Sequence, residues 1–225
     1  MRPEENGVPA VAVGDLVTPY KTIMTAPETF EVELKFPIAD ADDMTLQILA
    51  RGARRGGVVR QSDLYFQHPA RDFRQTHEAL RLRKTDDGVR ITYKGPIIDS
   101  RTKMRREIEL PVGREPADFE QFRELLTILG FEPVRGVDKT RALYDLTWEG
   151  RELELAVDAV DDLGNFLEIE SLAHDSDRDA ARDVILRLAE TLGLKNPERR
   201  SYLQLLIERA KSSDGPGPDR LDRQP

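Results

Sequence analysis

The stretch that decides the fold of this 225-residue chain is Phe30-Glu31-Val32-Glu33-Leu34-Lys35-Phe36, in which apolar and charged side chains alternate at every position. Successive side chains of a β-strand point to opposite faces, so Glu31, Glu33 and Lys35 would share one face. The apolar side chains between them would share the other. The stretch therefore predicts an amphipathic strand whose charged face carries both acids and a base.

The same alternation recurs along the chain and predicts a sheet of about eight strands. Alternating stretches cover residues 79–83, 89–94, 105–110, 152–158 and 166–170, and two further extended stretches cover residues 58–66 and 137–146. Helices are fewer. Apolar residues at helical spacing predict them over residues 40–49, 116–129, 176–192 and 201–210.

The charged faces of these strands decide between two architectures. For any one strand, the simpler interpretation is a sheet whose charged face lies in water and whose apolar face packs on helices. Six or more strands share the pattern, and their charged positions are almost purely Glu, Arg and Lys rather than Thr, Ser and Gln. This favours an α+β fold built on a closed antiparallel eight-stranded β-barrel, a tunnel, with helices packed on the outside.

A tunnel lined by both signs of charge predicts a particular kind of ligand. Buried charges are costly unless acids and bases pair, or unless a metal and an anion complete the balance. Carboxylates hold hard cations through oxygen, while Lys and Arg hold phosphate oxygens. The pattern is therefore typical of a site for a metal-bound polyphosphate.

Composition divides the chain and narrows its partners. Residues 1–27 read as a flexible leader, residues 28–210 as one domain, and residues 211–225 as a disordered tail. The absence of Cys excludes disulfides, Cys-ligated zinc and thiol catalysis. The formal net charge of −8 argues against binding to nucleic acid or to anionic membranes. No apolar run is long enough to cross a bilayer, so we expect a cytoplasmic protein.

The charged strands also resemble a known family. Glu31-Val32-Glu33-Leu34-Lys35 matches the ExExK signature of the CYTH superfamily, the triphosphate tunnel metalloenzymes. Further motifs follow in the order of that family: Leu80-Arg81-Leu82-Arg83, Tyr93-Lys94-Gly95-Pro96, Arg105-Arg106-Glu107-Ile108-Glu109, Lys139-Thr140-Arg141, and Asp158 with Phe166-Leu167-Glu168-Ile169-Glu170. Leu163-Gly164-Asn165-Phe166 and the late segment over residues 200–206 are closest to the class IV adenylate cyclase branch.

The resemblance implies roles for the charged residues. It implies that carboxylates bind Mg²⁺ (or Mn²⁺), through Glu31, Glu33, Glu168 and Glu170. It implies that cationic side chains bind the triphosphate, through Lys35, Arg81, Arg83, Lys94, Arg105, Lys139 and Arg141. Lys35, Lys94 and Asp158 are the candidate catalytic residues, with Asp158 as the base if one is needed.

The implied reaction is the conversion of ATP to cyclic AMP and pyrophosphate. Hydrolysis of inorganic or thiamine triphosphate by the same residues is the alternative, because related branches of the family are triphosphatases. A non-catalytic module that binds a nucleotide or polyphosphate is a third hypothesis. The sequence shows no adenine pocket that would decide among them, and the resemblance leaves a homodimer open.

Overall fold

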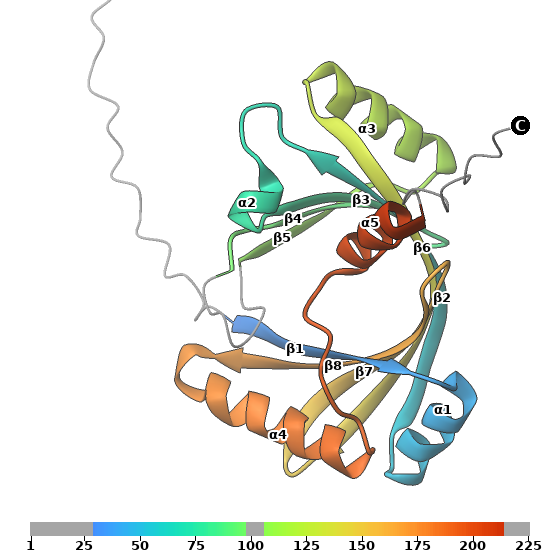
Figure 1. Ribbon diagram of the computed structural model, residues 1–225, viewed down its shortest axis with the longest axis vertical. Helices are drawn as coiled ribbons and strands as arrows, with labels where there is room; N and C mark the ends of the chain where they lie inside the picture. Colours follow the sequence, from blue (N-terminus) through green and yellow to red (C-terminus); the bar gives the residue numbers. More distant parts are fainter. Residues whose placement is uncertain (1–28, 98–105, 214–225) are drawn as a thin grey trace, which may run out of the picture.

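The computed structural model describes residues 29–97 and 106–213, which form one antiparallel sheet of eight strands with helices around it (Figure 1). The strands are β1 (Thr29–Ile38), β2 (Arg54–Gln67), β3 (Ala79–Thr85), β4 (Gly88–Lys94), β5 (Glu107–Gly113), β6 (Glu132–Trp148), β7 (Arg151–Val160) and β8 (Gly164–His174). Their order across the sheet is β1-β8-β7-β6-β2-β3-β4-β5. All eight predicted strands are therefore present, and the α+β class is confirmed.

Five α-helices accompany the sheet in the described part of the chain: α1 (Ala41–Ala50), α2 (Phe73–Thr76), α3 (Pro116–Ile128), α4 (Arg178–Thr191) and α5 (Tyr202–Ser213). A short 3-10 turn, η1 (Asp175–Asp177), leads into α4, which explains why α4 begins two residues later than predicted. Helix α2 was not predicted, because one turn of helix carries too few residues to show a period. None of the described helices has the length and apolar character needed to span a membrane.

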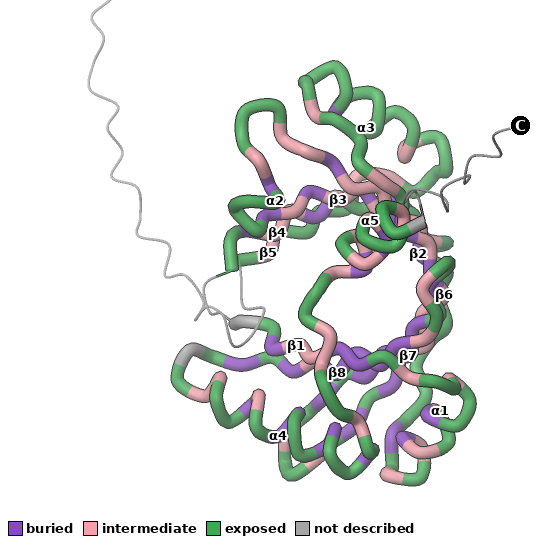
Figure 2. Tube along the Cα trace, in the orientation of Figure 1, coloured by how far each residue is buried: buried purple, intermediate pink, exposed green. Residues whose placement is uncertain are grey.

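The outer face of the sheet holds most of the core. Helices α1 and α4 cover β1, β7 and β8 around a cluster that includes Val32, Leu155 and Ile169, all fully buried. Helix α3 covers β3, β4 and β5 around Leu82 and Leu126. Figure 2 shows buried segments along these strands in purple. Burying one Leu or Ile side chain stabilises the fold by about 1.5–3 kcal/mol. The face of each strand that carries the apolar residues therefore packs against the helices.

The sheet curves into a C but is not closed by pairing among the described residues. Strands β1 and β5 are its two edges and lie on opposite arms of the C (Figure 1). The predicted closed barrel is therefore not confirmed. Each edge strand carries a proline, Pro37 in β1 and Pro111 in β5, and proline has no N–H to donate to a further strand. Proline within a sheet is typical of edge strands, so both residues fit the positions of β1 and β5.

Helix α5 contradicts the prediction that all helices lie outside. It sits within the concave side of the C (Figure 1), where Tyr202 and Leu206 pack on Val137, Val160 and Phe166. The reason is that the inner face is apolar at this end of the strands, although it is charged elsewhere. One end of the concave face is therefore covered by the chain itself.

Helix α5 continues to Ser213, three residues past its predicted end, and the Ser212 hydroxyl donates to the Glu208 carbonyl at 3.0 Å within this last turn. The division into a leader, a domain and a tail from residue 211 stays a prediction. The leader over residues 1–27 and the tail after residue 213 lie outside the described residues.

Candidate active site

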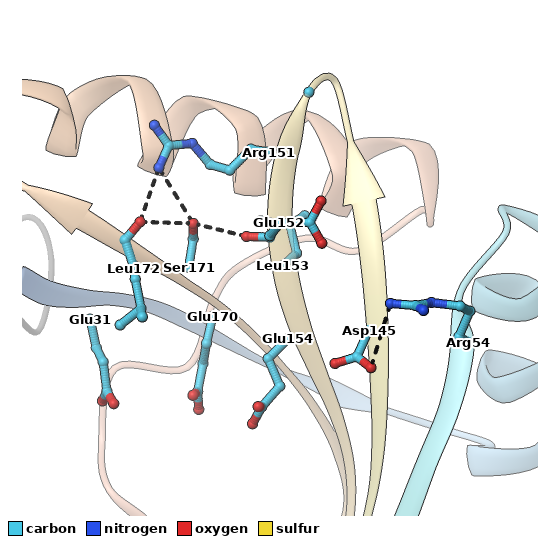
Figure 3. Close-up of a pocket in the computed structure, with 11 residues that line it drawn as sticks. Glu31, Arg54, Asp145, Arg151, Glu152, Leu153, Glu154, Glu170, Ser171 and Leu172 are labelled. Atoms are coloured by element: carbon cyan, nitrogen blue, oxygen red, sulfur yellow. Dashed lines mark hydrogen bonds and ion pairs between the residues drawn. The ribbon is translucent and has the colours of Figure 1, made fainter.

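One row of acids crosses the concave face from β1 to β7. The strand register places Glu33 of β1 opposite Glu170 of β8, and Glu170 opposite Glu154 of β7. Glu31 lies two residues from Glu33 on the same face of β1. Figure 3 shows Glu31, Glu154 and Glu170 pointing to the same side, beside a cavity of about 740 Å³. Negative charge is thus concentrated at one end of the concave face.

The acids raise one another's affinity for protons. Burial raises the pKa of Glu170 to about 8, and the nearby carboxylates of Glu33 and Glu168 add to this rise while Arg141 opposes it. Desolvation and Glu107 likewise raise the pKa of Glu31, although its side chain reaches solvent, and Lys94 opposes them. This end of the face therefore favours positive charge, either protons or cations.

The carboxylates of the acidic row are suitable ligands for Mg²⁺, but they do not converge on one point. Within residues 29–97 and 106–213, no three acidic or histidine side chains converge closely enough to hold one ion by themselves. Mg²⁺ is usually bound by one or two carboxylates, with water and substrate phosphate completing its shell. Glu33 and Glu170, directly opposite each other in the register, could supply such a pair of carboxylates.

We expect the stability of the metal-free protein to fall between about pH 5 and pH 8 because of Glu170. A carboxyl whose folded pKa is raised binds its proton more tightly in the folded state, so rising pH removes that stabilisation. Glu170→Gln should raise the melting temperature at pH 8.5 in EDTA and flatten the decline. Thermal unfolding of both proteins from pH 5 to pH 9 checks this. Glu149→Gln is the control, because Arg187 lowers the pKa of Glu149. A parallel decline in Glu170→Gln and wild type would contradict the expectation.

Cations gather further along the strands, around Asp158. The Lys139 Nζ donates to Asp158 Oδ2 at 2.8 Å, and Arg141 donates through Nε to Oδ1 at 2.8 Å and through Nη2 to Oδ2 at 2.6 Å. Arg141 also forms a close ion pair with Glu168. Asp158 has no exposed surface. It therefore serves as the counter-charge of two buried cations.

A second carboxylate that pairs with two cations, Asp63, lies on β2 and contacts β3. Arg83 donates to both oxygens of Asp63, at 2.6 and 2.7 Å, and Arg81 lies 3.5 Å from the same carboxylate. Burial acts to raise the pKa of Asp63, but the hydrogen bonds from Arg83 and the charge of Arg81 outweigh it and lower the pKa. Asp63 is thus ionised and balances two arginines with one charge.

Five cationic side chains lie at this end of the concave face: Lys35, Arg81, Arg83, Lys139 and Arg141. Their buried carboxylate partners are Asp63, Asp158 and Glu168. Glu109 also lies 3.8 Å from Arg81, and Glu170 of the acidic row lies 4.0 Å from Arg141. Cations held in place by buried acids are suited to a multiply charged anion.

Lys35 is directed toward the C-terminal segment. Its side chain is buried, its Nζ donates to the Arg200 carbonyl at 2.7 Å, and the Nζ lies 4.0 Å from the ring centroid of Tyr202. The backbone N–H of Glu198 donates in turn to the Lys35 carbonyl at 2.7 Å. The segment before α5 therefore fixes both the backbone and the side chain of Lys35.

These elements recur in known proteins. Residues 29–202 match the family model of the CYTH domain, which is more than half of the chain. The chain belongs to the CYTH family. A Methanocaldococcus jannaschii protein named "putative adenylate cyclase" is 35% identical over 178 residues, which are 78% of this chain and 97% of that protein.

Solved structures share the CYTH fold. A Pyrococcus horikoshii protein has a TM-score of 0.70 and 36% identity, and the match covers 80% of this chain and 99% of that one. A Hippeastrum protein has a TM-score of 0.55 and 19% identity, covering 81% and 96% of the two chains. Its structure is described as that of a putative adenylyl cyclase with a dominant triphosphatase activity, and at this identity the likeness concerns the fold alone.

The CYTH domain brings most of the predicted site residues to one face. Glu31, Glu33 and Glu170 lie at the acidic end, and Lys35, Arg81, Arg83, Lys139 and Arg141 lie with Glu168 and Asp158 further along. Lys94 of β4 pairs with Glu107 of β5 at 2.7 Å, and both lie close enough to Glu31 to act on its pKa in opposite directions. Arg105 lies outside the described residues.

Three residues of this CYTH domain escaped the prediction of the site. Glu154 has the same parity as Asp158 on β7, but only the β7–β8 register places it opposite Glu170. Asp63 has both of its arginine partners on another strand, β3, and local sequence does not show that pairing. Tyr202 lies in the last predicted helix and gave no signal that the helix enters the concave face.

Proposed function

We propose that this chain is a divalent-metal-dependent enzyme that converts ATP to cyclic AMP and pyrophosphate. The supporting observation is the division of the concave face into an acidic row around Glu33 and Glu170 and a cation-rich region around Asp63 and Asp158. A metal-bound triphosphate needs both, side by side. The relative from Methanocaldococcus jannaschii, named as a putative adenylate cyclase, supports this choice of reaction.

The cationic side chains would do most of the binding. Arg81, Arg83, Lys139 and Arg141 present N–H donors to phosphate oxygens, and their buried carboxylate partners hold them in place without cancelling their charge. In cyclisation the ribose 3′-oxygen bonds to the α-phosphorus as pyrophosphate leaves. The same cations would stabilise the charge that develops on the leaving group. Mg²⁺ bound at the acids would polarise the phosphate and lower the pKa of the attacking hydroxyl.

Asp158 fits a supporting role better than that of a base. Its carboxylate is fully buried and receives hydrogen bonds from Lys139, Arg141 and Tyr202. These donors occupy both oxygens of a carboxylate that has no exposed surface, so its geometry suits holding the two cations rather than meeting a substrate hydroxyl. We therefore assign it to the positioning of Lys139 and Arg141.

Hydrolysis of a triphosphate is the second candidate, and one observation favours it. The cavity beside the acids is lined by charged, polar and aliphatic residues, and no aromatic is among the described residues that line it. A purine base would find no ring to stack on at that point. Water as the attacking group would use the same cations and the same metal carboxylates.

Product analysis separates the candidates. Purified protein is incubated with ATP and Mg²⁺ or Mn²⁺, and the products are resolved by ion-exchange chromatography, with inorganic and thiamine triphosphate tested in parallel. Cyclisation predicts equal amounts of cyclic AMP and pyrophosphate. Phosphate release without cyclic AMP would overturn the cyclase proposal in favour of hydrolysis. No turnover of any of the three would favour a non-catalytic binding module.

A further inference from the structure

Tyr202 contacts three charged residues of the candidate site with one side chain. Its hydroxyl donates to Asp158 Oδ2 at 2.9 Å. Its ring lies 4.0 Å from the Nζ of Lys35 and 4.9 Å from the Nζ of Lys139, measured to the ring centroid. The side chain is buried, and Phe166 packs against it at 5.0 Å between ring centroids. No other described aromatic ring contacts both of these lysines.

The chemistry of these contacts favours fixed ammonium groups. An aromatic face attracts a cation most strongly where water is excluded, without neutralising its charge. Burial and the carboxylates of Glu168 and Asp158 hold the pKa of the Tyr202 phenol far above its usual range, so its hydroxyl stays a proton donor to Asp158. A carboxylate in place of this ring would instead compete with an incoming anion for the lysines.

We propose that Tyr202 is a positioning residue for triphosphate binding, which orients Lys35 and Lys139 by its ring and Asp158 by its hydroxyl. This inference rests on the proposed function for the identity of the anion. It also assigns a role to α5, because the helix brings its first residue into the concave face, where the ring completes the cationic region. Lys35, Asp158 and Tyr202 come from three separate elements, so α5 must be docked for the region to form.

Two variants separate the contribution of the Tyr202 hydroxyl from that of its ring. Tyr202→Phe keeps the ring and removes the hydroxyl, whereas Tyr202→Leu removes both. The control is Tyr144→Phe, because Tyr144 is equally buried but lies on the outer face, where its hydroxyl contacts Thr45 at 3.3 Å. All variants are made in the full chain, and binding of inorganic triphosphate in the presence of Mg²⁺ is measured by isothermal titration calorimetry.

We expect the affinity for inorganic triphosphate to fall roughly 10-fold in Tyr202→Phe, because a hydrogen bond to a charged group is lost. In Tyr202→Leu it should fall roughly 100-fold, because the cation–ring contacts go as well. Tyr144→Phe should stay within about 2-fold of wild type, since it loses only a remote neutral hydrogen bond. KM for a turned-over triphosphate should rise in the same order.

The outcomes are distinct. A merely structural role would lower the melting temperature of the Tyr202 variants and leave the affinity of the folded protein unchanged, which would overturn the proposal. Equal effects of Tyr202→Phe and Tyr144→Phe would do the same. If Tyr202→Leu does not fold, Tyr202→Phe decides. Binding without turnover by wild type would refute the proposed enzyme activity but would still test Tyr202, whereas failure of wild type to bind the anion would overturn both.

Discussion

Replacement of Asp158 by asparagine is expected to lower the free energy of unfolding by about 3–5 kcal/mol. The substitution keeps the shape of the side chain but leaves Lys139 and Arg141 without their shared counter-charge. Lys139 is 3% exposed, and burial already lowers its pKa, so water cannot compensate the loss. Breaking a buried ion pair by removing one partner costs far more than breaking one at the surface.

Asp161→Asn is the matched control for this experiment. Asp161 lies three residues along the chain and pairs with Arg60 at 2.5 Å, but about half of each side chain is exposed. Its removal should cost less than about 1 kcal/mol. Urea unfolding of the two variants and wild type, followed by circular dichroism, measures the difference. A loss of similar size in both variants would contradict the role of Asp158 as a buried counter-charge.

Glu33→Gln should reduce metal-dependent turnover by at least about 100-fold. Even groups that only orient metal ligands change metal affinity or activity by about 10–100-fold when altered, so a direct carboxylate ligand should matter more. Glu33 lies opposite Glu170 in the register, and the amide would leave that pair with one charge fewer. The Mg²⁺ concentration required for half-maximal rate should rise as well.

The measurement is the rate of triphosphate turnover over a range of Mg²⁺ concentrations. Glu149→Gln serves as the control, because Glu149 lies in the β6–β7 turn, has an exposed side chain paired with Arg187 at 2.6 Å, and is not among the residues that line the cavity beside the acids. It should keep the wild-type rate and the wild-type Mg²⁺ dependence. Turnover by Glu33→Gln within about 3-fold of wild type would show that Glu33 is not a metal ligand.

The alternation of apolar and charged side chains along each strand could be predicted from the sequence, because it depends only on local backbone geometry. Alternation placed Glu31, Glu33 and Lys35 on one face of β1 and Val32 on the other, and the structure buries Val32 under α4 and α1. The same parity put Asp158 on the face of the other charged residues. These inferences need no knowledge of which strands are neighbours.

Features that depend on contacts between distant segments could not be predicted from local alternation. The acid row exists because β8 lies between β1 and β7, so that Glu154 meets Glu170. The open edges depend on which strands pair, and β1 and β5 each have a partner on one side only. The entry of α5 into the concave face depends on Tyr202 and its partners on other elements. Register, closure and helix docking are long-range properties, and a single sequence shows only their local components.

A crystal structure of the protein with inorganic triphosphate and Mn²⁺ would show directly whether the concave face binds both, because anomalous scattering locates the metal. We expect a Mn²⁺ peak in contact with the carboxylates of Glu33 or Glu170 and with phosphate oxygens. We also expect Arg83, Lys139 or Arg141 to donate to the same triphosphate. A metal or a triphosphate bound away from the concave face, or no binding of either, would contradict these expectations.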